Sequence, residues 1–264
     1  MNFRFNYFIP FIIIGLFSCQ GGSVSRKTDV SEVKIENIKI SRYEQALFSI
    51  DKTNLQQELE KLQPSYPMFL DGDLSDSSNL KRIYDYLSDT MLISVYKDCQ
   101  ARYPNLTAFE SELTEAFRHL KYYYPKGNLP DVYTYVSGFD FEYPVQYFDG
   151  HFLVALDMYL GADYPRYRKL GLANYILRRF SSDYLIRDCM MAIAQSQTDN
   201  RKVGSALIDK MIGEGKKLWF VAAMLPDLPE TILLDYTPAQ LEWATKGESV
   251  VWAFLIENEM LYST

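Results

Sequence analysis

The spacing of apolar residues divides the chain into helical stretches and a short extended region. In the helical stretches apolar residues recur every three or four positions, the period of one helix face. These helices are expected at residues 42–48, 53–62, 80–102, 106–123, 172–197, 203–226, 237–243 and 248–260. Pro64 and Pro104 follow the second and third of them, where a proline ends a helix because it has no N–H to donate.

Extended segments are expected near the start of the folded part and in its middle. Residues 33–40 (VKIENIKI) alternate apolar and polar side chains, as a strand does. Residues 131–137 are a second β-type run, and residues 145–157 divide into two strands around Asp149-Gly150, a strong signal for a tight hairpin. The chain is therefore predicted to be a mostly helical α+β protein with a small antiparallel central sheet.

One residue in the helix at 203–226 does not fit its apolar pattern. At 100° per residue, Val203, Leu207, Met211 and Leu218 form one stripe, and Glu214 falls on the same stripe. An isolated buried carboxylate is costly, so Glu214 is expected to be buried and protonated, paired or bound to a ligand. The glycines on both sides of it indicate close approach of another segment.

The first residues have the form of a bacterial lipoprotein signal. Residues 7–17 (YFIPFIIIGLF) are apolar but too few to span a bilayer comfortably, and they lead into LFSC, which ends at Cys19 and has the form of a lipobox. We expect residues 1–18 to be a cleaved signal peptide. Cys19 would then carry the lipid, and residues 19–33 would form a flexible tether. The alternative is an uncleaved N-terminal anchor with an incidental cysteine.

Composition narrows the classes of function. Hydrophobic residues make up 48% of the 264 residues, enough for a large core, and we expect a single domain over residues 34–264. The net charge is −7 and the basic residues are scattered, which argues against nucleic-acid binding. Cys99 and Cys189 remain after Cys19, and they could form a disulfide in an oxidising envelope or stay as two buried thiols.

A set of segments in a fixed order forms the most specific pattern in the chain. They are the lipobox at Cys19, then IKISRYE, LKYYYP, VYTYVSGFD, FLVALDMYLG, DKMIGEGKKLWF and LPDLPETILLDYTPAQLEW. Together they resemble the gliding-motility lipoprotein GldB family of Bacteroidota over nearly the whole mature chain. Members of that family look longer at the C-terminus, so this chain is expected to be a shorter relative or to lack a final packing helix.

The resemblance implies a non-catalytic, lipid-anchored protein of the cell envelope. It implies protein partners in the gliding motility or type IX secretion machinery, with attachment to the cell membrane or the outer membrane. No acidic run follows Cys19, which favours a position facing the periplasm. A third hypothesis is that the protein is a lipoprotein with a purely structural role.

The GldB-like fold in turn resembles, at a distance, zinc metallopeptidases of the HExxH type. Glu214, in GEGKKLWF, would take the place of the glutamate ligand that a later helix supplies in those enzymes. The HExxH motif places two histidines one turn apart, whereas His119 and His151 lack that spacing. The resemblance therefore implies a zincin-like scaffold without its zinc motif, a pseudoenzyme with no metal and no cofactor.

Carboxylates and tyrosines supply the remaining candidate chemistry. Asp157 and Glu214 could converge in a cleft and serve an envelope hydrolase, peptidase-like or glycosidase, which is the alternative function. His119 and His151 are expected to be structural. The tyrosines at 122–124, with those at 133 and 135, are either a carbohydrate-stacking surface or, more commonly, half-buried packing residues.

Overall fold

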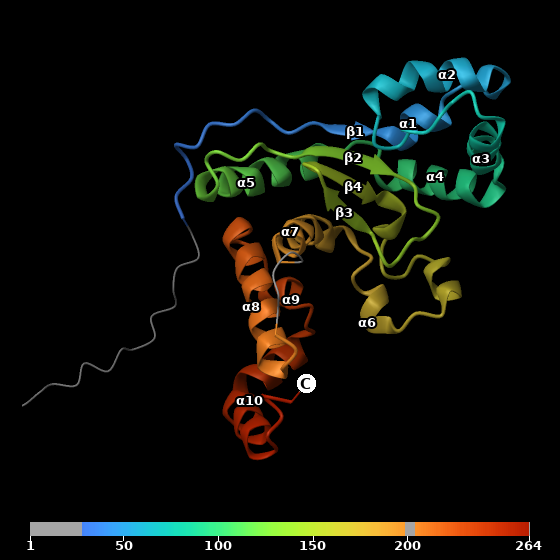
Figure 1. Cartoon of the computed structure of the whole chain (residues 1–264). Coiled ribbons are helices and arrows are strands. Elements are labelled where there is room, and N and C mark those ends of the chain that lie inside the picture. The colour runs from blue at the N-terminus through green and yellow to red at the C-terminus, as the bar shows by residue number, and fades with distance from the viewer. Residues whose placement is uncertain (1–27, 199–203, 264) are drawn as a thin grey trace, which may run out of the picture.

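The computed structural model describes residues 28–198 and 204–263, which form helices around a small sheet (Figure 1). The expected signal peptide, Cys19 and most of the expected tether lie outside the described residues, as does Val203. Within the described residues, no helix combines the length and apolarity needed to cross a membrane. The mostly helical α+β class is confirmed.

Four strands form one mixed sheet in the order β1-β2-β4-β3. They are β1 (Ile40–Arg42), β2 (Asp131–Tyr135), β3 (Val145–Phe148) and β4 (His151–Ala155). β2 pairs in parallel with both β1 and β4, and β3 and β4 are antiparallel. The prediction of an antiparallel sheet is therefore wrong. It rested on the hairpin signal alone, whereas the long connections before and after β2 allow parallel neighbours.

The hairpin itself is confirmed. Asp149 and Gly150 have φ values of 48° and 77°, the positive values that a two-residue type I′ turn requires. The first strand is shorter than the alternation at residues 33–40 predicts, because pairing with β2 begins only at Ile40. Before that point the N–H of Ile38 donates to the hydroxyl of Thr114 at 3.0 Å, so this segment bonds to a helix instead of a strand.

The first half of the chain supplies the helices that precede β2. They are α1 (Tyr43–Phe48), α2 (Leu55–Leu62), α3 (Ser77–Ser88), α4 (Thr90–Arg102) and α5 (Thr107–Tyr123). The single helix predicted at 80–102 is in fact α3 and α4. Asp89 separates them with extended backbone angles, and its carboxylate accepts the N–H groups of Met91 and Leu92. The apolar period is the same on both sides of Asp89, so it did not reveal the break.

The main core lies between the sheet and α7 (Ser182–Thr198), which packs against β3 and against α8 (Leu207–Met224). Every residue of α7 from Tyr184 to Ala194 is buried. Cys99 and Cys189 are both buried, free thiols, which decides the question that the sequence left open. Burial raises the pKa of both thiols, so they stay protonated and unreactive.

From α8 onward, the helices extend away from the sheet (Figure 1). After α6 (Asn174–Leu177), α7 and α8 come α9 (Glu230–Leu233) and α10 (Pro238–Glu257). The two helices predicted at 237–243 and 248–260 are one helix. The sequence Thr237-Pro238-Ala239-Gln240 has the form of a capping box, and the structure confirms it: Thr237 Oγ1 accepts the N–H of Gln240, and Gln240 Oε1 accepts the N–H of Thr237.

We call α10, residues 207–216 of α8 and the tail at residues 258–263 the C-terminal arm. No residue of α10 is buried, and the buried part of α8 is confined to its last turns at residues 221–224. The tail returns to the start of α8, where the N–H groups of Leu207 and Ile208 donate to the carbonyls of Ser263 and Leu261. The first turn of α8 is thus capped by backbone from the end of the chain.

Candidate functional site

Glu214 lies on the surface of α8. Its side chain is 64% exposed, and its carboxylate accepts from the ammonium of Lys217 at 2.5 Å. The prediction that Glu214 is buried is therefore wrong. A helical period identifies one face of a helix, but only the last turns of α8, residues 221–224, are buried in the core, and Glu214 lies before them on the part of α8 that is at most half-buried.

Asp157 is fully buried just after β4. Its oxygens accept the N–H of Ser137 and the N–H of Phe139, both at 2.8 Å, and the hydroxyl of Ser137 at 3.0–3.1 Å. Burial raises the pKa of Asp157, and these hydrogen bonds oppose that rise. Phe139 has a φ of 72°, so the carboxylate holds a strained turn after β2. Asp157 fastens the ends of two parallel strands, and the structure does not bring it into a shared cleft with Glu214.

The two histidines lie on different elements, α5 and β4. His119 is buried on α5, burial lowers its pKa, and its Nδ1 has no hydrogen-bond partner among the described residues. His151 begins β4, with its Nε2 3.7 Å from a carboxylate oxygen of Asp131. In residues 28–198 and 204–263, no group of three or more His, Cys, Asp or Glu side chains is arranged to hold a metal ion.

Two buried ionic groups were not predicted from the sequence. Glu44 is 1% exposed, and its carboxylate accepts from Arg42 Nε at 2.7 Å and from the hydroxyl of Thr134 at 2.7 Å. Asp188 on α7 accepts from Arg187 at 2.8 Å and from the hydroxyl of Tyr159 at 3.0 Å. The segment IKISRYE, which helped to carry the family resemblance, contains the first of these ion pairs.

The tyrosines singled out in the sequence divide into two kinds. Tyr133 and Tyr135 on β2 pack around Phe69, with ring centroids 6.1 and 5.6 Å away, so they are half-buried packing residues. Those at 122 and 123 are more exposed and contact each other edge to face. Tyr124 differs from the rest because its ring lies near Phe220 of α8, with 6.4 Å between the ring centroids.

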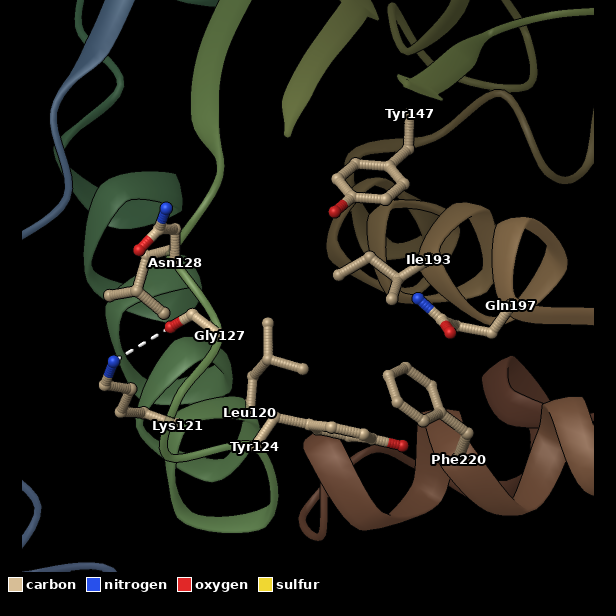
Figure 2. Close-up of a pocket in the computed structure, with 10 residues that line it drawn as sticks. Leu120, Lys121, Tyr124, Gly127, Asn128, Tyr147, Ile193, Gln197 and Phe220 are labelled. Atoms are coloured by element: carbon tan, nitrogen blue, oxygen red, sulfur yellow. Dashed lines mark hydrogen bonds between the residues drawn. The ribbon is translucent and has the colours of Figure 1, made fainter. Parts of the chain in front are cut away.

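Tyr124 and Phe220 belong to a pocket where α5, α7, α8 and β3 meet (Figure 2). The pocket has a volume of about 140 Å³. Its apolar walls are Leu120, Leu129, Ile193 and Phe220. Its polar lining residues include Tyr124, Asn128, Tyr147 and Gln197. Figure 2 shows the hydroxyl of Tyr147 and the amide of Gln197 pointing into the space between the helices.

The C-terminal arm carries the other candidate site, an exposed apolar face. Trp243, Val250 and Phe254 are 67%, 69% and 55% exposed, and their spacing of seven and four residues places them on one stripe of α10. Ile256 and Trp219 add further exposed apolar surface on α10 and α8. Apolar side chains that gather on one exposed face are typical of an interaction surface.

Comparison with known proteins gives a family for the whole folded part. The family model described as gliding motility protein GldB matches residues 23–264. No curated protein matches the chain, and no solved structure matches it. The distant resemblance to zinc peptidases therefore has no support from these comparisons, whereas the family resemblance is confirmed. The chain belongs to the gliding motility protein GldB family, a family of lipoproteins.

Proposed function

We propose that this protein is a non-catalytic component of the cell envelope, anchored by a lipid on Cys19, that binds other proteins of the gliding motility or type IX secretion machinery. The observation that carries the proposal is the exposed apolar face of α10, formed by Trp243, Val250 and Phe254. Large aromatic side chains are enriched at protein interfaces and supply much of their binding energy. Family membership supports the association with gliding motility.

The charges around this face favour a protein partner over a lipid surface. Glu242 and Glu257 border this stripe of α10, and the one basic residue of the helix, Lys246, has its ammonium paired with Glu242 at 2.6 Å. Anionic lipid headgroups would be repelled by such a rim. A partner with an apolar helix or groove bordered by Lys and Arg would match both the apolar face and its acidic surroundings.

Two observations support a non-catalytic role. Asp157 uses its carboxylate to hold the turn after β2, and Glu214 is an exposed partner of Lys217. A two-carboxylate hydrolase needs both groups on either side of one scissile bond. The hydrolase alternative predicts turnover of peptides or glycans that Glu214→Gln abolishes, and we expect the purified protein to show no such turnover.

Site-specific photo-crosslinking in cells tests the interaction directly. A photoreactive amino acid at 243, 250 or 254 is expected to give one discrete crosslinked species, with the same protein captured from all three positions. The matched control is position 175 on α6, because Tyr175 is also an exposed aromatic residue but lies outside the arm. The proposal fails if position 175 gives the same product, or if the three arm positions give none.

Substitution of the face tests its link to motility. The double change Trp243→Ser and Phe254→Ser is expected to reduce colony spreading or secretion without lowering the amount of the protein in the membrane fraction. The control is Lys246→Ser together with Thr245→Ser, which changes the same helix but leaves the apolar stripe intact. Normal spreading of the double variant would contradict the proposal.

The lipid anchor has its own test. Metabolic labelling with a fatty-acid analogue is expected to mark the wild-type chain and to leave Cys19→Ser unmarked. Cys189→Ser is the matched control, since that thiol is buried and should not affect labelling. Equal labelling of wild type and Cys19→Ser would rule out acylation at Cys19.

A further inference from the structure

The pocket between α5, α7, α8 and β3 has no part in the proposed function, yet its lining has the chemistry of a ligand site (Figure 2). We propose that this pocket binds one neutral sugar ring, either free or as one unit of a glycan. The proposal is independent of the arm, since the exposed stripe of α10 contributes nothing to the pocket lining.

The size of the pocket fits one ring. Its volume is about 140 Å³, whereas the smallest cavity that holds one water has about 10–15 Å³ of such space. The pocket therefore has room for a small organic group and not only for a single water, and one six-membered sugar ring is in this size range. The apolar side chains of Leu120, Ile193 and Phe220 form walls against which the C–H groups of such a ring can pack.

The polar side chains of the pocket have hydrogen-bonding groups that no described residue uses. The side chains of Tyr124, Asn128, Tyr147 and Gln197 have no hydrogen-bond partner within the described part of the chain. Phenol hydroxyls and carboxamides can both donate and accept hydrogen bonds. Sugar hydroxyls also do both, so this set of side chains complements them.

The charge of the lining favours a neutral ligand. Lys121 is the one charged residue that lines the described pocket, and its ammonium already donates to the carbonyl of Gly127 at 2.8 Å (Figure 2). Protein sites for carboxylates and phosphates generally offer a guanidinium or several cationic donors. This pocket offers neither, so an acidic sugar or a nucleotide phosphate would lack a counter-charge.

The arrangement of the aromatic rings favours a puckered ring over a flat one. The rings of Tyr124 and Phe220 are tilted by 51°, with their centroids 6.4 Å apart. A flat base or aromatic group held by two aromatic side chains would require nearly parallel faces. Two tilted faces instead form a corner, which accommodates a saturated ring whose C–H bonds point in several directions.

Ligand-observed saturation-transfer NMR tests the proposal. The probes are N-acetylglucosamine and glucose, added to the full chain in a detergent that has no sugar headgroup. Saturation transfer to at least one of these sugars is expected. Gln197→Leu and Tyr147→Phe, which keep most of the side-chain shape, are each expected to weaken binding about threefold to tenfold, the effect of one lost hydrogen bond. Phe220→Ala is expected to remove binding, provided that its melting temperature shows a folded protein.

The controls separate a sugar site from a merely apolar cavity. Tyr122→Ala lies outside the pocket and Trp243→Ser lies on the arm, so both should bind the sugar as the wild type does. The proposal is overturned if neither sugar binds, if Gln197→Leu and Tyr147→Phe both bind it unchanged, or if adenosine or phenol displaces it at lower concentration. If position 243 gives no crosslink while the sugar still binds, the proposed protein interaction of the arm is contradicted and the proposed sugar site is not.

Discussion

The sheet and the C-terminal arm place their large apolar side chains in opposite surroundings. Phe152 on β4 is fully buried between the rings of Phe117 and Tyr147, whose centroids lie 6.2 and 5.0 Å away. Trp243 and Phe254 on α10 are as large but mostly exposed. The difference arises because α5 and β3 contribute rings that cover Phe152, whereas no described element covers the stripe on α10. Burial is thus decided by what packs on a face, and not by how apolar the face is.

Polar groups differ between the two regions in the same way. In the rest of the described chain, which we call the body, Glu44 and Asp157 are buried, and each accepts several hydrogen bonds. On the arm, the exposed carboxylates of Glu214 and Glu242 each pair with a lysine three or four residues away. Buried pairs are costly to break, while exposed pairs contribute about 0–1 kcal/mol. The two regions therefore should respond differently to the same kind of substitution.

The largest contrast is expected between two aromatic truncations. Phe152→Ala should lower the free energy of unfolding by about 3–5 kcal/mol, because it opens a cavity in the core. Trp243→Ala, the matched change on the arm, should alter it by less than about 0.5 kcal/mol. Equilibrium denaturation in urea measures both. A comparable loss of unfolding free energy in Trp243→Ala would mean that Trp243 packs against another part of the protein. The contrast between the sheet and the arm would then be wrong.

The next effect concerns a buried ion pair. Glu44→Ala removes the partner of Arg42, whose side chain is 12% exposed, and should cost on the order of 3 kcal/mol. Glu242→Ala removes an exposed partner of Lys246 and should cost less than about 0.5 kcal/mol. Urea denaturation of the two variants, compared with Glu44→Gln, shows how much of the loss depends on the charge. Equal midpoints for Glu44→Ala and Glu242→Ala would contradict the prediction.

A smaller effect is expected at the start of the arm helix. Thr237→Ala removes the side-chain acceptor of the capping box and should destabilise α10 by about 1 kcal/mol. Thr245→Ala is the control, because its hydroxyl bonds only to the carbonyl of Leu241 within the same helix. Hydrogen exchange should become faster in α10 and stay unchanged in α7. Uniform acceleration in both helices would show that the arm and the body unfold together.

The smallest effect is a dependence of stability on pH. Burial lowers the pKa of His119 below its ordinary value of 6.5. Below pH 6.5 the unfolded chain therefore binds a proton that the folded chain does not, so the free energy of unfolding should fall as the pH drops through this range. His119→Gln should flatten the curve between pH 7 and 5. Parallel curves for the wild type and the variant would mean that His119 has the same pKa in the folded and the unfolded chain, which would contradict the prediction.

Local features of the fold were predicted from the sequence, and long-range ones were not. The turn at Asp149-Gly150 and the cap at Thr237 depend on residues next to each other, so their chemistry is visible in the sequence. The parallel pairing of β1 with β2 depends on contacts between segments far apart in the chain. The exposure of Glu214 likewise depends on where the covering elements end, which periodicity does not report.

The pocket is another long-range feature that could not be predicted from the sequence. Tyr124 belongs to the tyrosine stretch that the sequence singled out, but nothing local connects it with Tyr147, Gln197 or Phe220. These residues come from a strand and two other helices, and only the packing of α7 and α8 brings them together. The aromatic and amide residues that line the pocket are common types, and they do not form a recognisable sequence motif.

The strand order also implies an order in which the strands pair during folding. The β3–β4 hairpin closes through two residues, whereas β1 pairs with β2 across the whole segment that contains α1 to α5, with Ile40 opposite Val132. Closing a longer loop costs more entropy, so the hairpin is expected to form early and β1 to join the sheet late. During that interval the outer edge of β2 has unpaired N–H and C=O groups. A newly made chain is therefore most exposed to pairing with a second copy at β2, before its own first strand arrives.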